Sequence, residues 1–211
     1  MTLAQWLVYH QQEVHLKDNC SWMGIITYKN PLDIWIYQEI IHEVQPDVIV
    51  EIGSYAGGST LFFAHMLDII GKGIVVTIDI DRIVYEAEHP RIVTITGDSS
   101  SESVVGRVAE LCEGRTVLVL HDGDHHAEQV IKDLRAYAPF VSVGSYLIVE
   151  DGISDQVRRG IGGGAFGDFP GGGPRAATRE FLTECDDFIV DTSREHYILT
   201  YNPEGFLKRL R

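Results

Sequence analysis

From about residue 47 onward, short β-branched runs alternate with segments in which apolar residues recur at helical spacing. The runs that predict strands are DVIVEIG, GIVVTIDID, RIVTITGD, RTVLVLHDGD and SYLIVEDG, in that order. The helix-like segments include HHAEQVIKDLRAYAP, which places four apolar residues on one helix face: Val130, Ile131, Leu134 and Tyr137. Continuous apolar strands separated by amphipathic helices are typical of a parallel sheet covered on both faces. We therefore predict a doubly wound α/β fold.

Three segments depart from this alternation. Residues 1–46 are predicted to be a helical cap that covers an edge or a pocket with aromatic side chains. The glycine-rich segment 160–174 cannot hold regular structure alone, and its position after the fifth predicted strand favours a lid over a disordered loop. The segment DDFIVDTSREHYILTYNP predicts a hairpin with strands at 188–190 and 197–201. Since neither a repeat nor a linker is visible, residues 1–211 are predicted to form a single domain.

The composition limits the classes of partner. The chain carries 31 acidic residues against 17 Lys plus Arg, a formal net charge of −14, so we expect no nucleic-acid partner. No apolar run approaches the roughly 20 residues that span a bilayer, and the N-terminus does not resemble a signal peptide, so we expect no membrane partner. The scattered Cys20, Cys112 and Cys185 are typical of reduced thiols in a cytoplasmic protein.

A strand, a glycine turn and a helix follow one another in VEIGSYAGGSTLFF. A nucleotide-triphosphate loop would need lysine at the position of Ser59, and Tyr55 interrupts the dinucleotide fingerprint. The remaining pattern, Glu51-x-Gly53-x-x-x-Gly57, is seen in methyltransferases that use S-adenosylmethionine (SAM). In such a turn, Glu51 can bind the cationic amino group of SAM, while Gly53 and Gly57 let the chain approach its methionine part. The alternative is a tight βα turn with incidental glycines.

Two further acids fall at predicted strand ends. Asp79 ends the second strand, where a carboxylate commonly binds ribose hydroxyls, and Asp81, two residues later, is the less favoured candidate. Asp98, in TGDSS, follows the third strand where an adenine ring would rest, and its carboxylate can accept a hydrogen bond from the adenine amine. Because ligands of such sheets bind beyond the carboxyl ends of the strands, SAM is the predicted cofactor.

Three more carboxylates gather where the fourth and fifth predicted strands end. Asp122 follows the fourth strand, and Glu150 and Asp151 follow the fifth. If the two strands are neighbours, these groups repel one another unless a hard divalent cation neutralises them, and oxygen ligands suit Mg²⁺. The alternative is that Asp122 and Asp151 only cap the segments that follow them.

Three histidines accompany Asp122 in HDGDHH. His121 lies at the strand end and is expected to pack or to form a hydrogen bond in the core. His125 is expected to face the same pocket as Asp122, whereas His126 points about 100° away around a helix and is expected to be solvated. We favour His125 as the general base for a hydroxyl proton over His125 as a metal ligand. The oxygen-rich set of residues disfavours a zinc hydrolase.

With these motifs in place, the sequence resembles the cephalosporin hydroxylase family, a group of class I SAM-dependent methyltransferases that includes rhamnosyl and macrolide-sugar O-methyltransferases. The resemblance spans about residues 22–209 and is carried by WMGIITYKNPLDIWIYQEII, PDVIVEIGSYAGGSTLFFA, VVTIDID, GDSS, HDGDHHAEQVIKDLRAYAPFVSVGSYLIVEDG, GPRAATREFL and YILTYNPEGFLKR. It implies a Rossmann-like, mostly parallel seven-stranded sheet with a C-terminal antiparallel hairpin.

The resemblance also implies roles for individual residues. Mg²⁺ would be held by Asp122, Glu150 and Asp151, with His125 placed as the base. SAM would be bound by residues of the first three strand ends and the segments that follow them: Glu51, Gly53, Ser54, Gly57, Ser59, Asp79, Asp98 and Ser99.

The predicted function is Mg²⁺-dependent O-methylation of one hydroxyl of a vicinal diol, on a sugar of a natural product or glycoconjugate, with a catechol as another acceptor. The metal would chelate both hydroxyls, and His125 would take the proton of the one to be methylated. The acceptor pocket would come from the first 40 residues, the 160–174 loop and a neighbouring subunit of a homo-oligomer. Two alternatives stay open: a non-catalytic SAM- or metal-binding protein, and a hydroxylase or hydrolase that uses the same acids with another metal.

Overall fold

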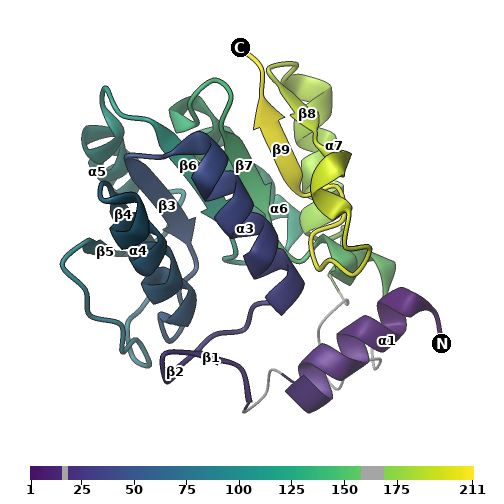
Figure 1. Ribbon diagram of the computed structural model, residues 1–211. Coiled ribbons are helices and arrows are strands. Elements are labelled where there is room, and N and C mark those ends of the chain that lie inside the picture. The colour runs from purple at the N-terminus through teal and green to yellow at the C-terminus, as the bar shows by residue number, and fades with distance from the viewer. Residues whose placement is uncertain (16–18, 158–168) are drawn as a thin grey trace.

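The computed structural model describes residues 1–15, 19–157 and 169–211 (Figure 1). Its centre is a seven-stranded sheet in the order β5-β4-β3-β6-β7-β9-β8. The strands are β3 (Val48–Ile52), β4 (Ile74–Asp79), β5 (Ile92–Thr96), β6 (Val117–His121), β7 (Tyr146–Val149), β8 (Phe188–Val190) and β9 (Phe206–Arg209). The five strands from β3 to β7 pair in parallel, and β9 is antiparallel to both β7 and β8. The predicted fold class is confirmed.

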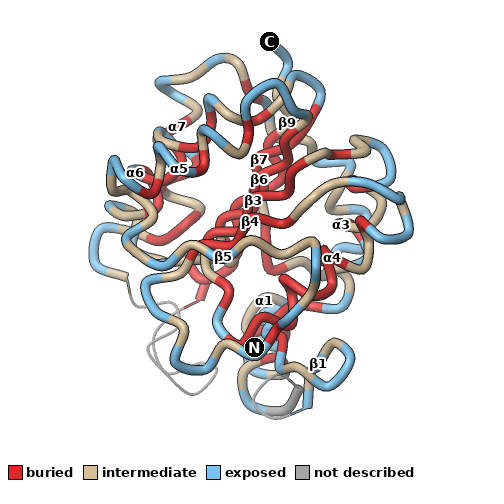
Figure 2. The backbone as a smooth tube through the Cα atoms, turned by 90° about the vertical axis from the view of Figure 1, so that its left-hand side faces the viewer, coloured by how far each residue is buried: buried red, intermediate tan, exposed pale blue. Residues whose placement is uncertain are grey.

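Helices cover both faces of the sheet, as the view along its edge shows (Figure 2). One face carries α3 (Pro31–Val44) and α4 (Gly58–Ile70), and the other carries α5 (Glu102–Cys112), α6 (Ala127–Tyr137) and α7 (Pro174–Glu184). Successive residues of β3 alternate between two cores, because strand side chains point to opposite faces. The four apolar residues that were predicted to share one face of α6 are all buried. No described helix combines the length and apolarity that a membrane span requires.

The register brings the last residues of the central strands level with one another. Ile52 of β3 pairs with Ile78 of β4 and with His121 of β6, and His121 pairs with Val149 of β7. The residues that follow these four therefore leave the sheet at the same edge. This alignment makes the acids predicted at the strand ends neighbours in space, as expected for a parallel sheet.

The N-terminal 46 residues are helical only in part, which corrects the prediction of a helical cap. The described elements before α3 are α1 (Leu3–Tyr9), the π-helix η1 (His10–His15), β1 (Ser21–Trp22) and β2 (Ile25–Ile26). β1 and β2 form a small antiparallel hairpin whose turn residues have positive φ angles, 51° for Met23 and 91° for Gly24. A right-handed helix does not allow these angles, so the helical segment is interrupted there.

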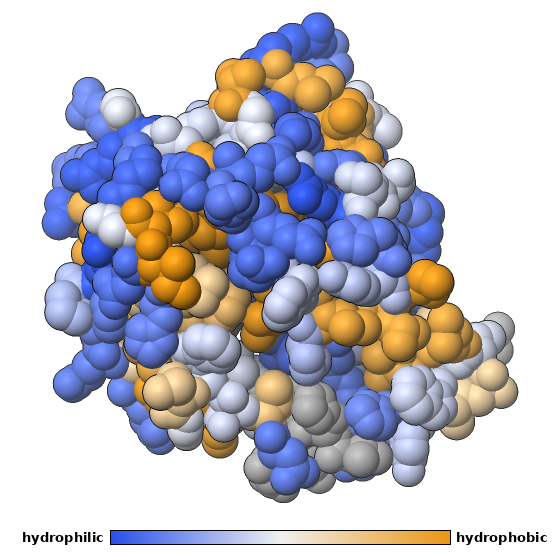
Figure 3. All heavy atoms as spheres, in the orientation of Figure 1, coloured by the Kyte–Doolittle hydropathy of each residue, from blue (hydrophilic) through white to orange (hydrophobic). Residues whose placement is uncertain are grey.

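Helix α1 packs against the segment that follows β7. Its Leu7 and Val8 form an apolar cluster with Ile153, Val157 and Tyr201. Figure 3 shows further apolar residues gathered on the surface over α1. The packing holds the start of the chain beneath the carboxyl end of β7, as the ribbon also shows (Figure 1).

The C-terminal hairpin is present, but its second strand is β9 and not the predicted segment 197–201. The Thr200 hydroxyl and the Tyr201 N–H instead donate to the Asp33 carboxylate of α3, at 2.6 and 2.8 Å. Asp33 is buried and needs hydrogen-bond donors, so it draws this segment away from the sheet. Short 3₁₀ helices complete the described elements: η2 (Ala138–Phe140), η3 (Gly152–Gln156) and η4 (Thr192–Glu195).

The predicted lid, residues 160–174, lies mostly outside the described residues, which resume at 169. In the described part, the ring of Phe169 stacks on the imidazole of His125, with ring centroids 5.9 Å apart. This end of the segment therefore reaches the predicted active site, and closure of a lid stays a prediction.

Candidate active site

A cavity of about 880 Å³ opens at the carboxyl ends of the parallel strands. Most of the predicted site residues line it: Gly53, Ser54, Ser59, Asp79, Asp98, Ser99, Asp122, His125 and Asp151. Glu51, Gly57 and Glu150 belong to the same strand ends but are not part of the cavity lining. The strand order thus gathers residues that lie up to about 100 positions apart in the sequence around one space.

The glycines of the turn after β3 are required by close packing. Gly53 has φ +85°, and a Cβ atom there would lie 2.0 Å from the carbonyl oxygen of Asp122. Gly57 has φ +91°, and a Cβ atom there would lie 2.6 Å from Cβ of Ala87. Gly53 lets the turn lie directly against the end of β6, whereas Gly57 packs against the loop after β4 and does not reach the cavity.

Glu51 is fully buried and points into the protein. Its carboxylate accepts hydrogen bonds from the hydroxyls of Ser59 at 2.6 Å and Thr77 at 3.0 Å, and from that of Thr60. Burial raises the pKa of Glu51, against the opposing effect of the Lys29 charge and these hydroxyls. The direct contact with the SAM amino group that the sequence suggested has no support in this geometry. Glu51 instead ties β3, β4 and the start of α4 together.

Asp79, at the end of β4, holds the glycine turn in place. Its Oδ2 accepts hydrogen bonds from the N–H groups of Ser54 and Tyr55, both at 2.9 Å. Burial raises the pKa of Asp79, but these donors outweigh burial and the pKa is lowered overall. Asp79 therefore lines the cavity as a charged carboxylate at neutral pH.

Asp98 and Ser99, which follow β5, differ in the hydrogen bonds that their side chains make within the protein. Asp98 accepts hydrogen bonds at Oδ1 from the N–H and the hydroxyl of Ser100, at 2.9 and 2.8 Å. The Ser99 hydroxyl donates to Asp133 of α6 at 2.7 Å. The Ser99 side chain is thus bonded to a helix, whereas Asp98 retains a second carboxylate oxygen at the cavity wall.

Sequence reasoning missed Arg82 and an aromatic pair on this side of the cavity. The Arg82 guanidinium donates to the carbonyls of Thr77 and Ile95, each at 2.8 Å, and so joins the ends of β4 and β5. The rings of Tyr28 and Tyr55 stack with centroids 5.0 Å apart, and both residues line the cavity. No repeating pattern of residues in the sequence predicts either feature, because both depend on contacts between separate loops.

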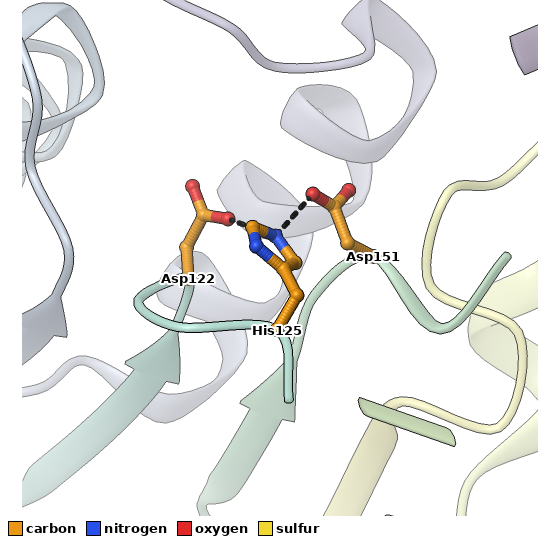
Figure 4. A group of neighbouring side chains, drawn as sticks. All are labelled: Asp122, His125 and Asp151. Atoms are coloured by element: carbon orange, nitrogen blue, oxygen red, sulfur yellow. Dashed lines mark hydrogen bonds and ion pairs between the residues drawn. The ribbon is translucent and has the colours of Figure 1, made fainter. Parts of the chain in front are cut away.

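Asp122, His125 and Asp151 converge at the ends of β6 and β7 (Figure 4). His125 Nε2 lies 2.7 Å from Asp151 Oδ2 and 3.8 Å from Asp122 Oδ1. One potential ligand atom from each residue lies within 4.8 Å of the others, and this is the group with that property among the described residues. Two carboxylates and an imidazole form a donor set that suits a divalent cation.

The imidazole of His125 is held by its acidic neighbours. Burial lowers the pKa of His125, but the hydrogen bond to Asp151 and the charges of Asp151, Asp122 and Asp124 outweigh burial and raise the pKa to about 9. His125 precedes α6, whose first residue is Ala127, so it lies on the loop and not on the helix. In the absence of a metal ion, a protonated His125 is the cation between the two aspartates.

Glu150 lies apart from this group and pairs with Lys29, which sequence reasoning missed. Lys29 Nζ donates to Glu150 Oε1 at 2.8 Å and to Asp122 Oδ2, and its side chain is 3% exposed. Burial lowers the pKa of Lys29, but the charges of Asp122, Glu150 and Glu51 outweigh burial and raise the pKa. Lys29 is therefore a resident counter-charge for the buried Glu150 and the partly buried Asp122. A metal-ligand role for Glu150 stays a prediction.

The other two histidines lie where the sequence indicated. His121 is buried, with Nε2 at 3.0 Å from Asp133 Oδ2. His126 is exposed and contacts Asp124, with its Nδ1 at 2.6 Å from Oδ1. Neither histidine lines the cavity, so His125 is the histidine of the site.

Replacing Lys29 by methionine should lower the free energy of unfolding by about 3 kcal/mol, because it leaves the buried Glu150 and the partly buried Asp122 without their counter-charge. Urea unfolding at pH 7 without divalent cations measures this loss. Lys72→Met is the matched control, since Lys72 pairs with Asp47 at 2.7 Å but its side chain is 45% exposed. The control should cost less than about 1 kcal/mol. Equal losses in the two variants would contradict the role assigned to Lys29.

Comparison with known proteins places this site in a family. The family model described as "Rhamnosyl O-methyltransferase/CmcI" matches residues 14–210. The chain is 32% identical over 197 residues to the rhamnosyl O-methyltransferase of Mycobacterium leprae (strain TN), which covers 90% of this chain and 82% of that protein. It is 30% identical over 198 residues to the rhamnosyl O-methyltransferase of Mycobacterium tuberculosis (strain ATCC 25618 / H37Rv), and this match covers 90% of this chain and 78% of that protein.

Solved structures share the fold at lower sequence identity. The structure "cmcI-D160 Mg-SAM" superposes with a TM-score of 0.69 at 21% identity, over 100% of this chain and 85% of the other. The methyltransferase MycE in complex with Mg, SAH and mycinamycin VI superposes with a TM-score of 0.54 at 21% identity, over 83% of this chain and 48% of the other. Because the family model matches nearly the whole chain, the protein belongs to the rhamnosyl O-methyltransferase/CmcI family.

Proposed function

We propose that this protein is a SAM-dependent, Mg²⁺-dependent O-methyltransferase that methylates a sugar hydroxyl. The observation that carries the proposal is one cavity that is lined both by Asp79 and Asp98 and by the group of Asp122, His125 and Asp151. The relatives named as rhamnosyl O-methyltransferases support the acceptor class. The similar structures that hold Mg with SAM or with SAH support the cofactors.

The wall formed by β3, β4 and β5 fits SAM. Asp79 is an anion at the end of β4, the position from which a carboxylate binds ribose hydroxyls in doubly wound folds. Asp98 keeps an oxygen available for the adenine amine. Gly53 lines the cavity where the turn after β3 packs directly against the end of β6. These features support the predicted cofactor site, with Glu51 as a residue that shapes the turn.

The wall formed by β6 and β7 fits a divalent cation and a general base. Asp122 and Asp151 would hold Mg²⁺, which would lower the pKa of an acceptor hydroxyl when bound, and SAM would supply the methyl group. Nε2 of His125 donates its proton to Asp151 Oδ2, so the neutral imidazole accepts the hydroxyl proton at its other ring nitrogen, Nδ1. The hydrogen bond to Asp151 and the charges of Asp151, Asp122 and Asp124 raise the pKa of His125, and a cation held by these carboxylates would reduce that effect. Asp151 orients the ring through its 2.7 Å hydrogen bond.

The acceptor side of the cavity is supplied by the two ends of the chain. Gln11, Gln12 and Glu13 of η1 line the same cavity as Tyr201 of the C-terminal loop. Their amide, carboxylate and phenol groups can both donate to and accept from the hydroxyls of a sugar. This composition supports a polyhydroxylated acceptor, and we propose a vicinal diol of a sugar as the group that is recognised.

The cellular setting follows from the same sequence features. The free cysteines Cys20, Cys112 and Cys185 support a reducing, cytoplasmic location. We propose a small-molecule acceptor and neither nucleic acid nor membrane as partner, in line with the net charge of −14. A homo-oligomer stays a prediction.

The cofactor site is tested by calorimetric titration with S-adenosylhomocysteine. The wild-type protein should bind it, and Asp79→Ala should weaken binding at least about tenfold, equivalent to about 1.4 kcal/mol, because the ribose-binding carboxylate is gone. Asp81→Ala is the control, since Asp81 lies two residues away, is exposed and does not line the cavity. Equal affinities of the two variants would remove Asp79 from the site, and no binding by the wild type would contradict the proposed cofactor.

The reaction is tested by methyl transfer from labelled SAM to a panel of rhamnosides and other glycosides with neighbouring hydroxyls. Transfer should require Mg²⁺ and stop when EDTA is added. His125→Ala should lower turnover by about 10²- to 10⁴-fold, the usual contribution of a general base, and leave the affinity for S-adenosylhomocysteine within twofold. Full activity in EDTA would contradict the metal-dependent mechanism, and unchanged turnover in His125→Ala would contradict the assigned base.

A further inference from the structure

Asn202 lies directly behind the proposed metal site, between α3 and the end of β7. Its side chain is fully buried and does not line the cavity. Its amide oxygen Oδ1 accepts a hydrogen bond from the backbone N–H of Asp151 at 3.0 Å, and its Nδ2 donates to the Tyr37 hydroxyl at 2.7 Å. Both ends of the Asn202 amide are therefore engaged, one of them by a residue of the site.

Asp151 adopts an uncommon backbone conformation, and Asn202 bonds to it at that point. Its φ and ψ angles are 61° and 21°, in the left-handed region that residues other than glycine seldom occupy. This turn at the end of β7 is where the carboxylate is directed to His125, with Oδ2 at 2.7 Å from Nε2. A residue in a strained conformation persists only when its surroundings hold it there.

The loop that carries Asn202 is itself fixed by α3. Asp33 accepts hydrogen bonds from the Thr200 hydroxyl at 2.6 Å and from the Tyr201 N–H at 2.8 Å, and the N–H of Asn202 donates to the Thr200 hydroxyl at 2.9 Å. Asp33 and Tyr37 are four residues apart and so lie on the same face of the helix. One buried face of α3 thus holds the loop by its backbone and orients the Asn202 side chain.

We propose that Asn202 is a positioning residue for Asp151. Asn202 fixes the left-handed turn that directs the Asp151 carboxylate to His125 and to a bound cation. The inference rests on the metal site proposed above and assigns a role to Asn202, which is buried and does not line the cavity. Residues that orient metal ligands without touching the ion typically change metal affinity by about 10- to 100-fold when they are removed. The expected defect is therefore in metal binding and not in cofactor binding.

The test is Mn²⁺ binding by the full chain, measured from the electron paramagnetic resonance signal of free Mn²⁺, with S-adenosylhomocysteine titration without metal as the second readout. Asn202→Ala should weaken Mn²⁺ binding about tenfold or more and leave the affinity for S-adenosylhomocysteine within twofold. Tyr37→Phe, which keeps Asn202 but removes the acceptor of its Nδ2–H, should weaken Mn²⁺ binding about threefold. If Asn202→Ala fails to fold, Tyr37→Phe decides, and wild-type Mn²⁺ affinity in that variant overturns the proposal.

Two further variants separate positioning from other effects. Tyr146→Phe is the control on the same strand: Tyr146 is buried on β7, and its hydroxyl donates to Asp191 at 2.7 Å and accepts from Arg194 at 2.9 Å. The variant therefore loses hydrogen bonds of β7 without touching the site. This variant should bind Mn²⁺ like the wild type. A tenfold loss of Mn²⁺ affinity in Tyr146→Phe would mean that any weakening of β7 lowers metal affinity, and this result would overturn the proposal. Asp151→Ala should abolish tight Mn²⁺ binding. If Asn202→Ala binds Mn²⁺ within twofold of the wild type, the positioning role is overturned but the metal site stands. If Asp151→Ala binds Mn²⁺ as the wild type does, or if the wild type binds none, both the metal site and the positioning role are overturned.

Discussion

The structure depends on how negative charge is balanced at the carboxyl ends of β6 and β7. Asp122, Glu150 and Asp151 come from adjacent strands and meet where the sheet ends. A buried carboxylate without a partner costs several kcal/mol, so cations must be supplied at the same place. Lys29 supplies one charge to Asp122 and Glu150, and His125 lies between Asp122 and Asp151. In the proposed function, a divalent cation held by Asp122 and Asp151 would complete this balance.

The sheet and its coverings contribute different parts of the site. The parallel strands bring the acids to one edge because their register aligns their last residues. The segments before β3 and after β8 supply what the sheet cannot: Lys29 against the acids, Gln11 and Tyr201 at the acceptor wall, and Asn202 behind Asp151. The buried face of α3 holds the loop of Tyr201 and Asn202 through Asp33 and Tyr37, so the helix would support the proposed metal site as well as cover the sheet.

Much of the fold and of the cavity could be predicted from the sequence, because the signals are local. The β-branched runs gave the parallel strands, and acids placed directly after them, such as Asp79 and Asp122, reach the cavity because strand ends meet at one edge. Lys29 was missed because only tertiary packing buries it against acids about 90 and 120 positions away. The second hairpin strand was misplaced because Asp33, far along the chain, holds residues 200 and 201 in a loop. Glu51 matched a cofactor pattern, but three nearby hydroxyls turn it inward.

In the proposed function, one cavity holds the cofactor and the metal side by side. A crystal structure of the protein with S-adenosylhomocysteine and Mn²⁺, with the anomalous signal of manganese recorded, tests it most directly. We predict a manganese peak bound by Asp122 and Asp151 and a ribose beside Asp79, and the same map shows whether Glu150 stays with Lys29 or joins the ion. A manganese peak away from these aspartates, or S-adenosylhomocysteine bound outside the cavity, would contradict the claim.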